Sequence, residues 1–201
     1  MPAVNIIVPN GKVLIVGAIY DKIEKFSIIE NIRSQYEFVI FNGGLCFPSD
    51  NIAKIANRIN KIQELMNNKT IYLSGRFDLS LLLNIDNTEI SNWILRNSNV
   101  AIIKFPKYNA IVTDGGIPPN INDIKKLYNN IETSFISNID NKSWHESYNG
   151  GLGYVISNNP LTNDFPKYYN YSMQLGNNYG LESNVYAQEI DEVGLKKTIL
   201  L

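Results

Sequence analysis

The chain has 201 residues, a formal net charge of −1 at pH 7, 44% hydrophobic residues and 18% charged residues. This is the balance of an ordinary globular protein, and the length suits one sizeable core, so we expect a single domain over residues 1–201. The near-neutral charge, with Lys and Arg scattered along the sequence, argues against a nucleic-acid-binding protein.

The first part of the chain predicts strands that alternate with helices. In chain order, we expect a strand at 13–16, a helix at 22–33, a strand at 37–41, a helix at 51–67 and a strand at 70–73. The strands are short apolar runs, and in both helices apolar residues recur three or four positions apart. This alternation is typical of a parallel sheet covered by helices.

The pattern becomes richer in strands after residue 89. We expect a short helix at 90–96, then two strands at 99–104 and 108–113 that a turn at 105–107 joins into a hairpin. A further helix is predicted at 122–131, and residues 137–151 form the loosest stretch. Four strands are predicted in the last third, at 153–157, 169–175, 184–190 and 195–201.

Compartment and membrane association are constrained by what the sequence contains. A single cysteine, Cys46, cannot form an internal disulfide, which is typical of a reducing compartment or a virion. We find no signal-peptide pattern, and no apolar run approaches the roughly 20 residues that span a bilayer. We therefore expect a cytoplasmic or virion protein with no membrane partner. The bias toward Asn, Ile, Lys and Tyr, whose codons are AT-rich, is typical of a low-GC genome such as that of a phage.

Five short segments follow predicted strands, at the positions where ligand sites of α/β sheets gather. In chain order they are Gly17-Ala18-Ile19-Tyr20-Asp21, the run from Gly43-Gly44 to Asp50, Gly75-Arg76-Phe77-Asp78, Asp114-Gly115-Gly116 and Ser157-Asn158-Asn159-Pro160. Their order and spacing resemble the five signature loops of the calcineurin-like metallophosphoesterases, which include the serine/threonine protein phosphatases. The resemblance covers about residues 12 to 190. It implies an α/β fold with two mixed β-sheets flanked by helices, a four-layer αββα sandwich.

That family uses two divalent metals such as Mn, Fe or Zn, about 3.5–4 Å apart, to activate a hydroxide and orient the phosphate. In the family the first two loops read Gly-Asp-x-His-Gly and Gly-Asp-x-x-Asp-Arg-Gly. Here Ala18 and Gly44 stand where the resemblance places metal-binding Asp residues, and neither has a donor atom. Tyr20 stands at the position of the first His, and a phenol that titrates near pH 10 is a poor ligand at neutral pH.

The remaining loops of the family read Gly-Asn-His-Asp or Gly-Asn-His-Glu, His-Gly-Gly and Gly-His-Thr-Pro. Here Arg76, a permanent cation, replaces the Asn, and Phe77 replaces the His that transfers a proton. Asp114 and Asn158 replace the last two His residues, with Asn159 as the match if the fifth loop is shifted by one. Only Asp114 remains a plausible metal ligand. The single His of the chain, His145, lies outside all five loops, so a structural zinc site of His and Cys is excluded by count.

These substitutions predict a pseudoenzyme, a phosphatase-like protein that needs no cofactor, has no catalytic residues and serves as a binding or assembly module. Its partner would be another protein, in a phage particle or another larger complex. One alternative is an active phosphoesterase with the unusual ligands Asp21, Asp50, Asp78 and Asp114. Another is a metal-free binder of a phosphorylated ligand, with Arg76 holding the phosphate. We also expect the Arg76 guanidinium to pair with Asp114 or Asp78 and to replace the lost metal charge.

Overall fold

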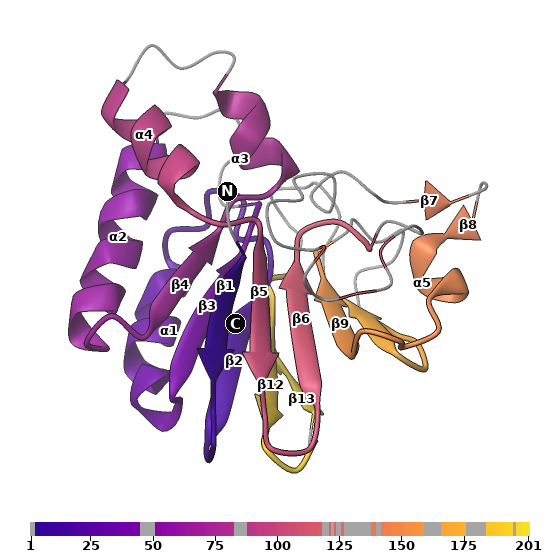
Figure 1. The fold of residues 1–201 in the computed structure, drawn as a ribbon. Helices are drawn as coiled ribbons and strands as arrows, with labels where there is room; N and C mark the ends of the chain where they lie inside the picture. Colours follow the sequence, from indigo (N-terminus) through magenta and orange to yellow (C-terminus); the bar gives the residue numbers. More distant parts are fainter. Residues whose placement is uncertain are drawn as a thin grey trace.

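The computed structural model describes residues 3–44, 51–82, 88–117, 121, 123, 126, 138–139, 142–158, 166–175, 184–194 and 196–201. Two mixed sheets stack face to face, and helices cover their outer faces (Figure 1). This is the predicted αββα arrangement of four layers. No helix in the described part of the chain is long and apolar enough to cross a membrane.

One sheet has five strands in the order β13-β12-β2-β3-β4. Its strands are β2 (Lys12–Val16), β3 (Phe38–Asn42), β4 (Thr70–Leu73), β12 (Tyr186–Asp191) and β13 (Lys196–Leu200). Strands β2, β3 and β4 run parallel, whereas β12 runs antiparallel to both β2 and β13. Helices α1 (Lys25–Ile32) and α2 (Ile52–Leu65) connect the parallel strands, which confirms the predicted strand–helix alternation. A 3₁₀ turn, η1 (Arg33–Gln35), ends the first connection.

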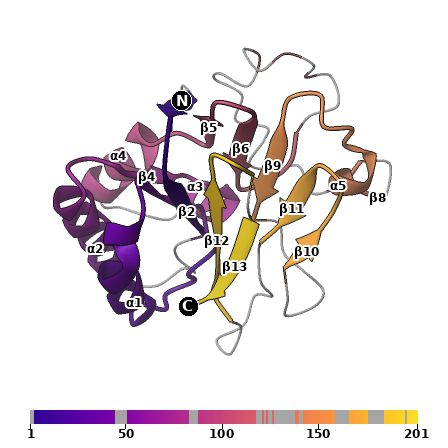
Figure 2. The same ribbon diagram turned by 90° about the horizontal axis from the view of Figure 1, so that it is seen from below.

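The second sheet has six strands in the order β1-β5-β6-β9-β11-β10. They are β1 (Val4–Ile7), β5 (Val100–Lys104), β6 (Asn109–Thr113), β9 (Tyr154–Ser157), β10 (Lys167–Tyr168) and β11 (Ser172–Gln174). The predicted hairpin is present as the antiparallel pair β5–β6. Strand β1 was not predicted. It is the edge strand of this sheet, and its backbone pairs in parallel with β5. The strand expected at 169–175 is shorter, since the chain turns before Ser172 and β10 pairs antiparallel with β11 (Figure 2).

The part of the chain that the structure describes has three further helices outside the parallel unit. They are α3 (Arg76–Leu81), α4 (Thr88–Arg96) and α5 (Trp144–Ser147). A two-stranded sheet of β7 (Asn138–Ile139) and β8 (Lys142–Ser143) precedes α5, within the stretch that the sequence indicated to be loosest. Most of the helix predicted at 122–131 lies outside the described residues.

Apolar side chains fill the spaces between the four layers, and alternation along each strand decides which space they enter. On β2, Leu14 and Val16 face helices α1 and α2, whereas Val13 and Ile15 face the other sheet. The outer face of the six-stranded sheet packs against the buried Trp144 of α5. The central strands are therefore buried on both faces, which explains why β2, β3, β5 and β6 are nearly continuous apolar runs.

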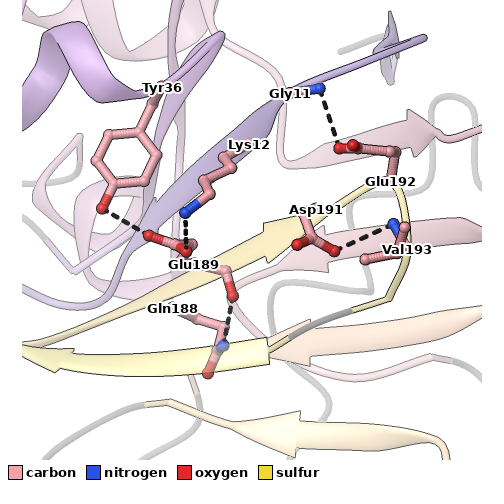
Figure 3. Close-up of polar contacts among 8 residues, drawn as sticks. All are labelled: Gly11, Lys12, Tyr36, Gln188, Glu189, Asp191, Glu192 and Val193. Atoms are coloured by element: carbon pink, nitrogen blue, oxygen red, sulfur yellow. Dashed lines mark hydrogen bonds and ion pairs between the residues drawn. The ribbon is translucent and has the colours of Figure 1, made fainter.

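A polar cluster secures β12 against the edge where β2 begins (Figure 3). The carboxylate of Glu189, which is 6% exposed, accepts a hydrogen bond from the Tyr36 hydroxyl at 3.1 Å and pairs with Lys12 at 2.8 Å. Glu192 accepts the backbone N–H of Gly11 at 3.0 Å. The burial of Tyr36 and the adjacent Glu189 raise its pKa to about 12. The cluster lies away from the strand ends that carry the candidate site.

Candidate functional site

The five segments singled out in the sequence meet at one edge of the sandwich, and hydrogen bonds join them into a closed ring. Strands β2, β3 and β4 deliver three of these segments from one sheet, and β6 and β9 deliver two from the other. We call this arrangement the loop ring. The first segment is joined to the second by the N–H groups of Ile19 and Tyr20, which donate to the Gly44 carbonyl at 3.1 and 3.0 Å. The second is joined to the third by Gly44 N–H to Asp78 Oδ2 at 3.0 Å, and the third to the fourth by Arg76 N–H to Asp114 Oδ2 at 2.7 Å. The fifth segment closes the ring, because Asn158 Nδ2 donates to Asp114 Oδ1 at 3.2 Å and Asn158 Oδ1 accepts from Ala18 N–H at 2.9 Å.

Gly44 occupies the most crowded point of the ring. Its φ of +59° lies in the left-handed region, and Gly43 before it has a φ of +67°. A Cβ atom at Gly44 would lie 2.7 Å from the Cβ of Ala18 and 3.1 Å from Asn158 Nδ2. These contacts are too short for any larger residue unless the loops move. The space that a bridging carboxylate would need is therefore filled by neighbouring loops.

Asp78 holds the second and third segments together. It is 1% exposed, and its Oδ2 accepts the backbone N–H groups of Gly75 at 2.8 Å and Gly44 at 3.0 Å. The sequence placed Gly75 to Asp78 in a loop, but Arg76 begins α3 and Asp78 is its third residue. An acid at this position satisfies N–H groups that a helix start leaves without partners, which explains why the helix forms directly after β4.

Asp114 joins the two sheets. It follows β6 and is 6% exposed, yet both of its carboxylate oxygens accept hydrogen bonds, one from Arg76 N–H and one from Asn158 Nδ2. Burial raises its pKa to about 7, because removing the charge from water outweighs the opposing hydrogen bond from Arg76, and the nearby charge of Asp78 raises the pKa further. Asp114 therefore exchanges its proton in the physiological range.

Arg76 enters the ring through its backbone. Its N–H donates to Asp114, and its guanidinium lies over the Phe77 ring with the Cζ atom 5.2 Å from the ring centroid. The Phe77 ring meets Tyr20 edge-on, with centroids 6.1 Å apart. A cation and two aromatic rings thus lie in contact beside the loop ring, at three positions where the resemblance expects metal ligands or a proton donor. A pairing of the guanidinium with Asp114 or Asp78 stays a prediction.

Two buried residues outside the five segments also support the loop ring: Asn42, which sequence reasoning missed, and His145, which it named but gave no role. Asn42, the last residue of β3, donates from Nδ2 to the Thr113 carbonyl at 3.0 Å and so ties the two sheets together. His145 lies 3% exposed between the hydroxyls of Ser157, 2.9 Å from Nε2, and Ser172, 2.7 Å from Nδ1. Burial lowers the pKa of His145 to about 3, so its imidazole is neutral. The only sequence signal for Asn42 was its position at the end of a strand, just before two glycines.

Few side-chain oxygens lie at the links of the loop ring, within the residues that the structure describes. Asp78, Asp114 and Asn158 supply the side-chain oxygens that lie at the ring's links, and each accepts hydrogen bonds from N–H groups of neighbouring segments. These hydrogen bonds order the segments without a metal ion, and each carboxylate oxygen that accepts a single N–H keeps a second lone pair. Within the described ranges, no three His, Cys, Asp or Glu side chains are grouped to hold a metal ion. Asp50, Cys46 and Asn159 lie outside the described residues.

Comparison with known proteins connects this architecture to one class. No family model matches the chain, and no curated protein matches its sequence. Among solved structures, a "putative diadenosine tetraphosphatase" superposes with a TM-score of 0.70 at 15% identity over 98% of each chain. A serine/threonine phosphatase from Saccharomyces cerevisiae, with similarity to human phosphatase PP5, superposes with a TM-score of 0.65 at 12% identity, over 98% of this chain and 84% of that one. Two mixed sheets with flanking helices, together with these neighbours, show that the chain has the calcineurin-like phosphoesterase fold.

Proposed function

We propose that this protein is a catalytically inactive relative of the metallophosphoesterases that serves as a binding or assembly module. Fold alone does not fix activity, so the proposal depends on the strand-end residues. Its main support is the loop ring, in which side-chain oxygens of Asp78, Asp114 and Asn158 accept hydrogen bonds from N–H groups of neighbouring segments. The ring performs the structural task of ordering the loops that the resemblance assigns to metal ions.

The residues that differ from the family's loop motifs support the same proposal. Ala18 and Gly44 supply no donor atom, and Phe77, at the position of the proton-transferring His, cannot carry a proton. His145 is buried and hydrogen-bonded to two serine hydroxyls, so it does not replace that function. We propose a protein partner that binds without metal, and a place in a larger assembly such as a phage particle.

A combined metal and activity assay tests the loss of catalysis. The purified protein is dialysed against Mn²⁺ or Zn²⁺, its metal content is measured, and its turnover of a generic aryl phosphate is compared with and without a chelator. We expect less than one bound ion per chain and no turnover above buffer. Turnover that disappears with the chelator and in Asp114→Asn would overturn the proposal. Affinity capture from the native source, repeated with the chelator, tests the metal-independent partner.

Two other functions follow from particular residues at the same edge. The proximity of Asp78 to Asp114, which raises the pKa of Asp114, favours an active phosphoesterase with Asp21, Asp50, Asp78 and Asp114 as ligands. The position of Arg76 at the start of α3 favours a metal-free phosphate binder. The same two buried carboxyl groups weaken the second idea, since they lower the electrostatic potential that a phosphate would meet. Thermal-shift measurements with inorganic phosphate, for the native protein and Arg76→Ala, separate it from the others.

A further inference from the structure

A groove between helices α2 and α4 lies outside the loop ring and takes no part in the proposed function. The two helices lie side by side on the outer face of the five-stranded sheet (Figure 1). The groove has a volume of about 590 Å³, which is within the range of small-molecule sites. Among the described residues, its lining comes from these two helices: Ala53, Ala56, Asn57, Asn60, Glu89, Ile90, Asn92, Trp93 and Arg96.

Trp93 is the fixed aromatic element of this groove. Its ring stacks on Tyr72 with centroids 4.4 Å apart and an interplanar angle of 10°. Its indole Nε1 donates to Asn60 Oδ1 at 3.3 Å. The two contacts hold the half-buried indole in one orientation, so a ligand that packs against it would not have to order the side chain first.

The polar residues of the groove are mostly amides, with one charge of each sign. Asn57, Asn60 and Asn92 are exposed, and an amide offers both a donor and an acceptor within one plane. Glu89 lies in the first turn of α4 and Arg96 in its last turn, so the groove has no excess charge. Such a lining suits a neutral ligand with many hydroxyl groups, because the opposite charges of Glu89 and Arg96 give the groove no net attraction for an anion or a cation.

A smaller hollow of about 240 Å³ adjoins the groove and shares Asn60, Trp93 and Arg96 with it. Thr70, the first residue of β4, also lines this hollow and is 3% exposed. Its Oγ1 has no hydrogen-bond partner within the protein, in the part that the structure describes. A buried hydroxyl without a partner costs free energy, but this oxygen is closed off from solvent, so a ligand in the hollow would reach it only after its neighbours move.

We propose that the α2–α4 groove is a carbohydrate-binding site that takes a neutral mono- or disaccharide. The apolar C–H face of a pyranose ring packs on an aromatic ring, and Trp93 supplies that surface. The amides of Asn57 and Asn92, with Glu89 and Arg96, supply donors and acceptors for neighbouring hydroxyl groups. The site is independent of the loop ring, so its test stands apart from that of the proposed function.

The two tryptophans of the chain make the test specific, because Trp144 lies buried behind the other sheet at 1% exposure. The full chain is screened on a glycan array, and maltose, cellobiose, lactose and any glycan that the array retains are then titrated into ¹⁵N-labelled protein. We expect the indole N–H signal of Trp93, assigned with Trp93→Phe, to shift while that of Trp144 stays in place. Adenosine monophosphate serves as the anionic competitor class and is expected to cause no shift.

Variants on the exposed rim keep the test independent of folding. Asn57→Ala combined with Asn92→Ala removes two amides that point away from the core and should weaken sugar binding at least tenfold. Asn31→Ala on α1 is a matched control, since Asn31 is also exposed and does not line either hollow. The proposal is wrong if no glycan is retained and no sugar shifts Trp93, if adenosine monophosphate binds instead, or if the double variant binds sugar as well as the native protein.

Discussion

The backbone N–H of Arg76 donates to Oδ2 of Asp114 at 2.7 Å, so the first residue of α3 is bonded to the residue that follows β6 in the other sheet. One carboxylate thereby connects the two sheets at the edge where the family would place its metals. Its other oxygen accepts from Asn158, which in turn accepts the N–H of Ala18. The order of this edge thus depends on buried hydrogen bonds, and their protonation and packing can be tested.

Replacing Asp114 by Asn should change how stability depends on pH. The folded pKa of about 7 lies above the ordinary value of 3.8, so the folded state holds the proton more tightly than the unfolded state. Asp114 therefore stabilises the fold fully below about pH 4, and this contribution is lost as the pH rises to about 7. The full change is on the order of 4 kcal/mol.

Urea unfolding of the native protein and of Asp114→Asn at pH 5.0 and pH 7.5 measures this contribution. The variant should lose stability relative to the native protein at pH 5.0 and recover part of it at pH 7.5, because it has no carboxylate to bury. Using the difference between the two proteins at each pH removes the contribution of all other titrating groups. An identical difference at both pH values would contradict the prediction.

His145 should stay neutral throughout the range in which an ordinary histidine titrates. Its folded pKa of about 3 lies below the ordinary value of 6.5, so the stability that it contributes is present above about pH 6.5 and is lost as the pH falls toward 3. Its imidazole signals are unambiguous in NMR spectra, since the chain has one His. We expect no change in their shifts between pH 8 and pH 5. A titration with a midpoint near 6.5 would show that the imidazole is exposed to water.

Gly44→Ala should destabilise the fold more than the same substitution at another glycine that has a positive φ but has room for a Cβ atom. Both Gly44, with a φ of +59°, and Gly194, with a φ of +87°, are left-handed. A Cβ at Gly194 meets its nearest atom at 3.9 Å, whereas one at Gly44 meets Ala18 at 2.7 Å. We expect a loss of about 1 kcal/mol for Gly194→Ala and about 3 kcal/mol for Gly44→Ala in urea unfolding. Equal losses would mean that the ring is not tightly packed there.

The cluster around Glu189 should be sensitive to loss of the acid and tolerant of loss of the base. Glu189→Ala removes the acceptor of the buried Tyr36 hydroxyl and should cost about 2 kcal/mol in the free energy of unfolding. Lys12→Ala should cost far less, because its side chain is 45% exposed and the pair is screened by water. Chemical denaturation of both variants measures this, and a larger loss for Lys12→Ala would contradict the assignment.

Local patterns predicted most of the regular structure because burial on both faces leaves a clear apolar run. Strand β4 at Thr70–Leu73 was predicted with its bounds, and the helix expected at 51–67 is α2 with slightly frayed ends. Strand β1 and helix α3 were missed, since Val4–Ile7 is stabilised by pairing with β5 and α3 by an acid that also bonds to Gly44. The pairing partner of β1 is distant in the sequence, and Asp78 combines a local contact to Gly75 with a distant one to Gly44.

The sequence by itself determined the order of most strands and helices, the positions of the five strand-end segments, and the residue types at Ala18, Gly44 and Phe77, whose side chains carry no oxygen, nitrogen or sulfur donor. Only the tertiary structure decided that these segments close into a ring, because the links run mostly from backbone N–H groups, which every residue other than proline carries and no residue type reveals. The elevated pKa of Asp114 was likewise decided only by the tertiary structure. It arises from burial between two sheets, and burial is a property of the packed chain rather than of the residue.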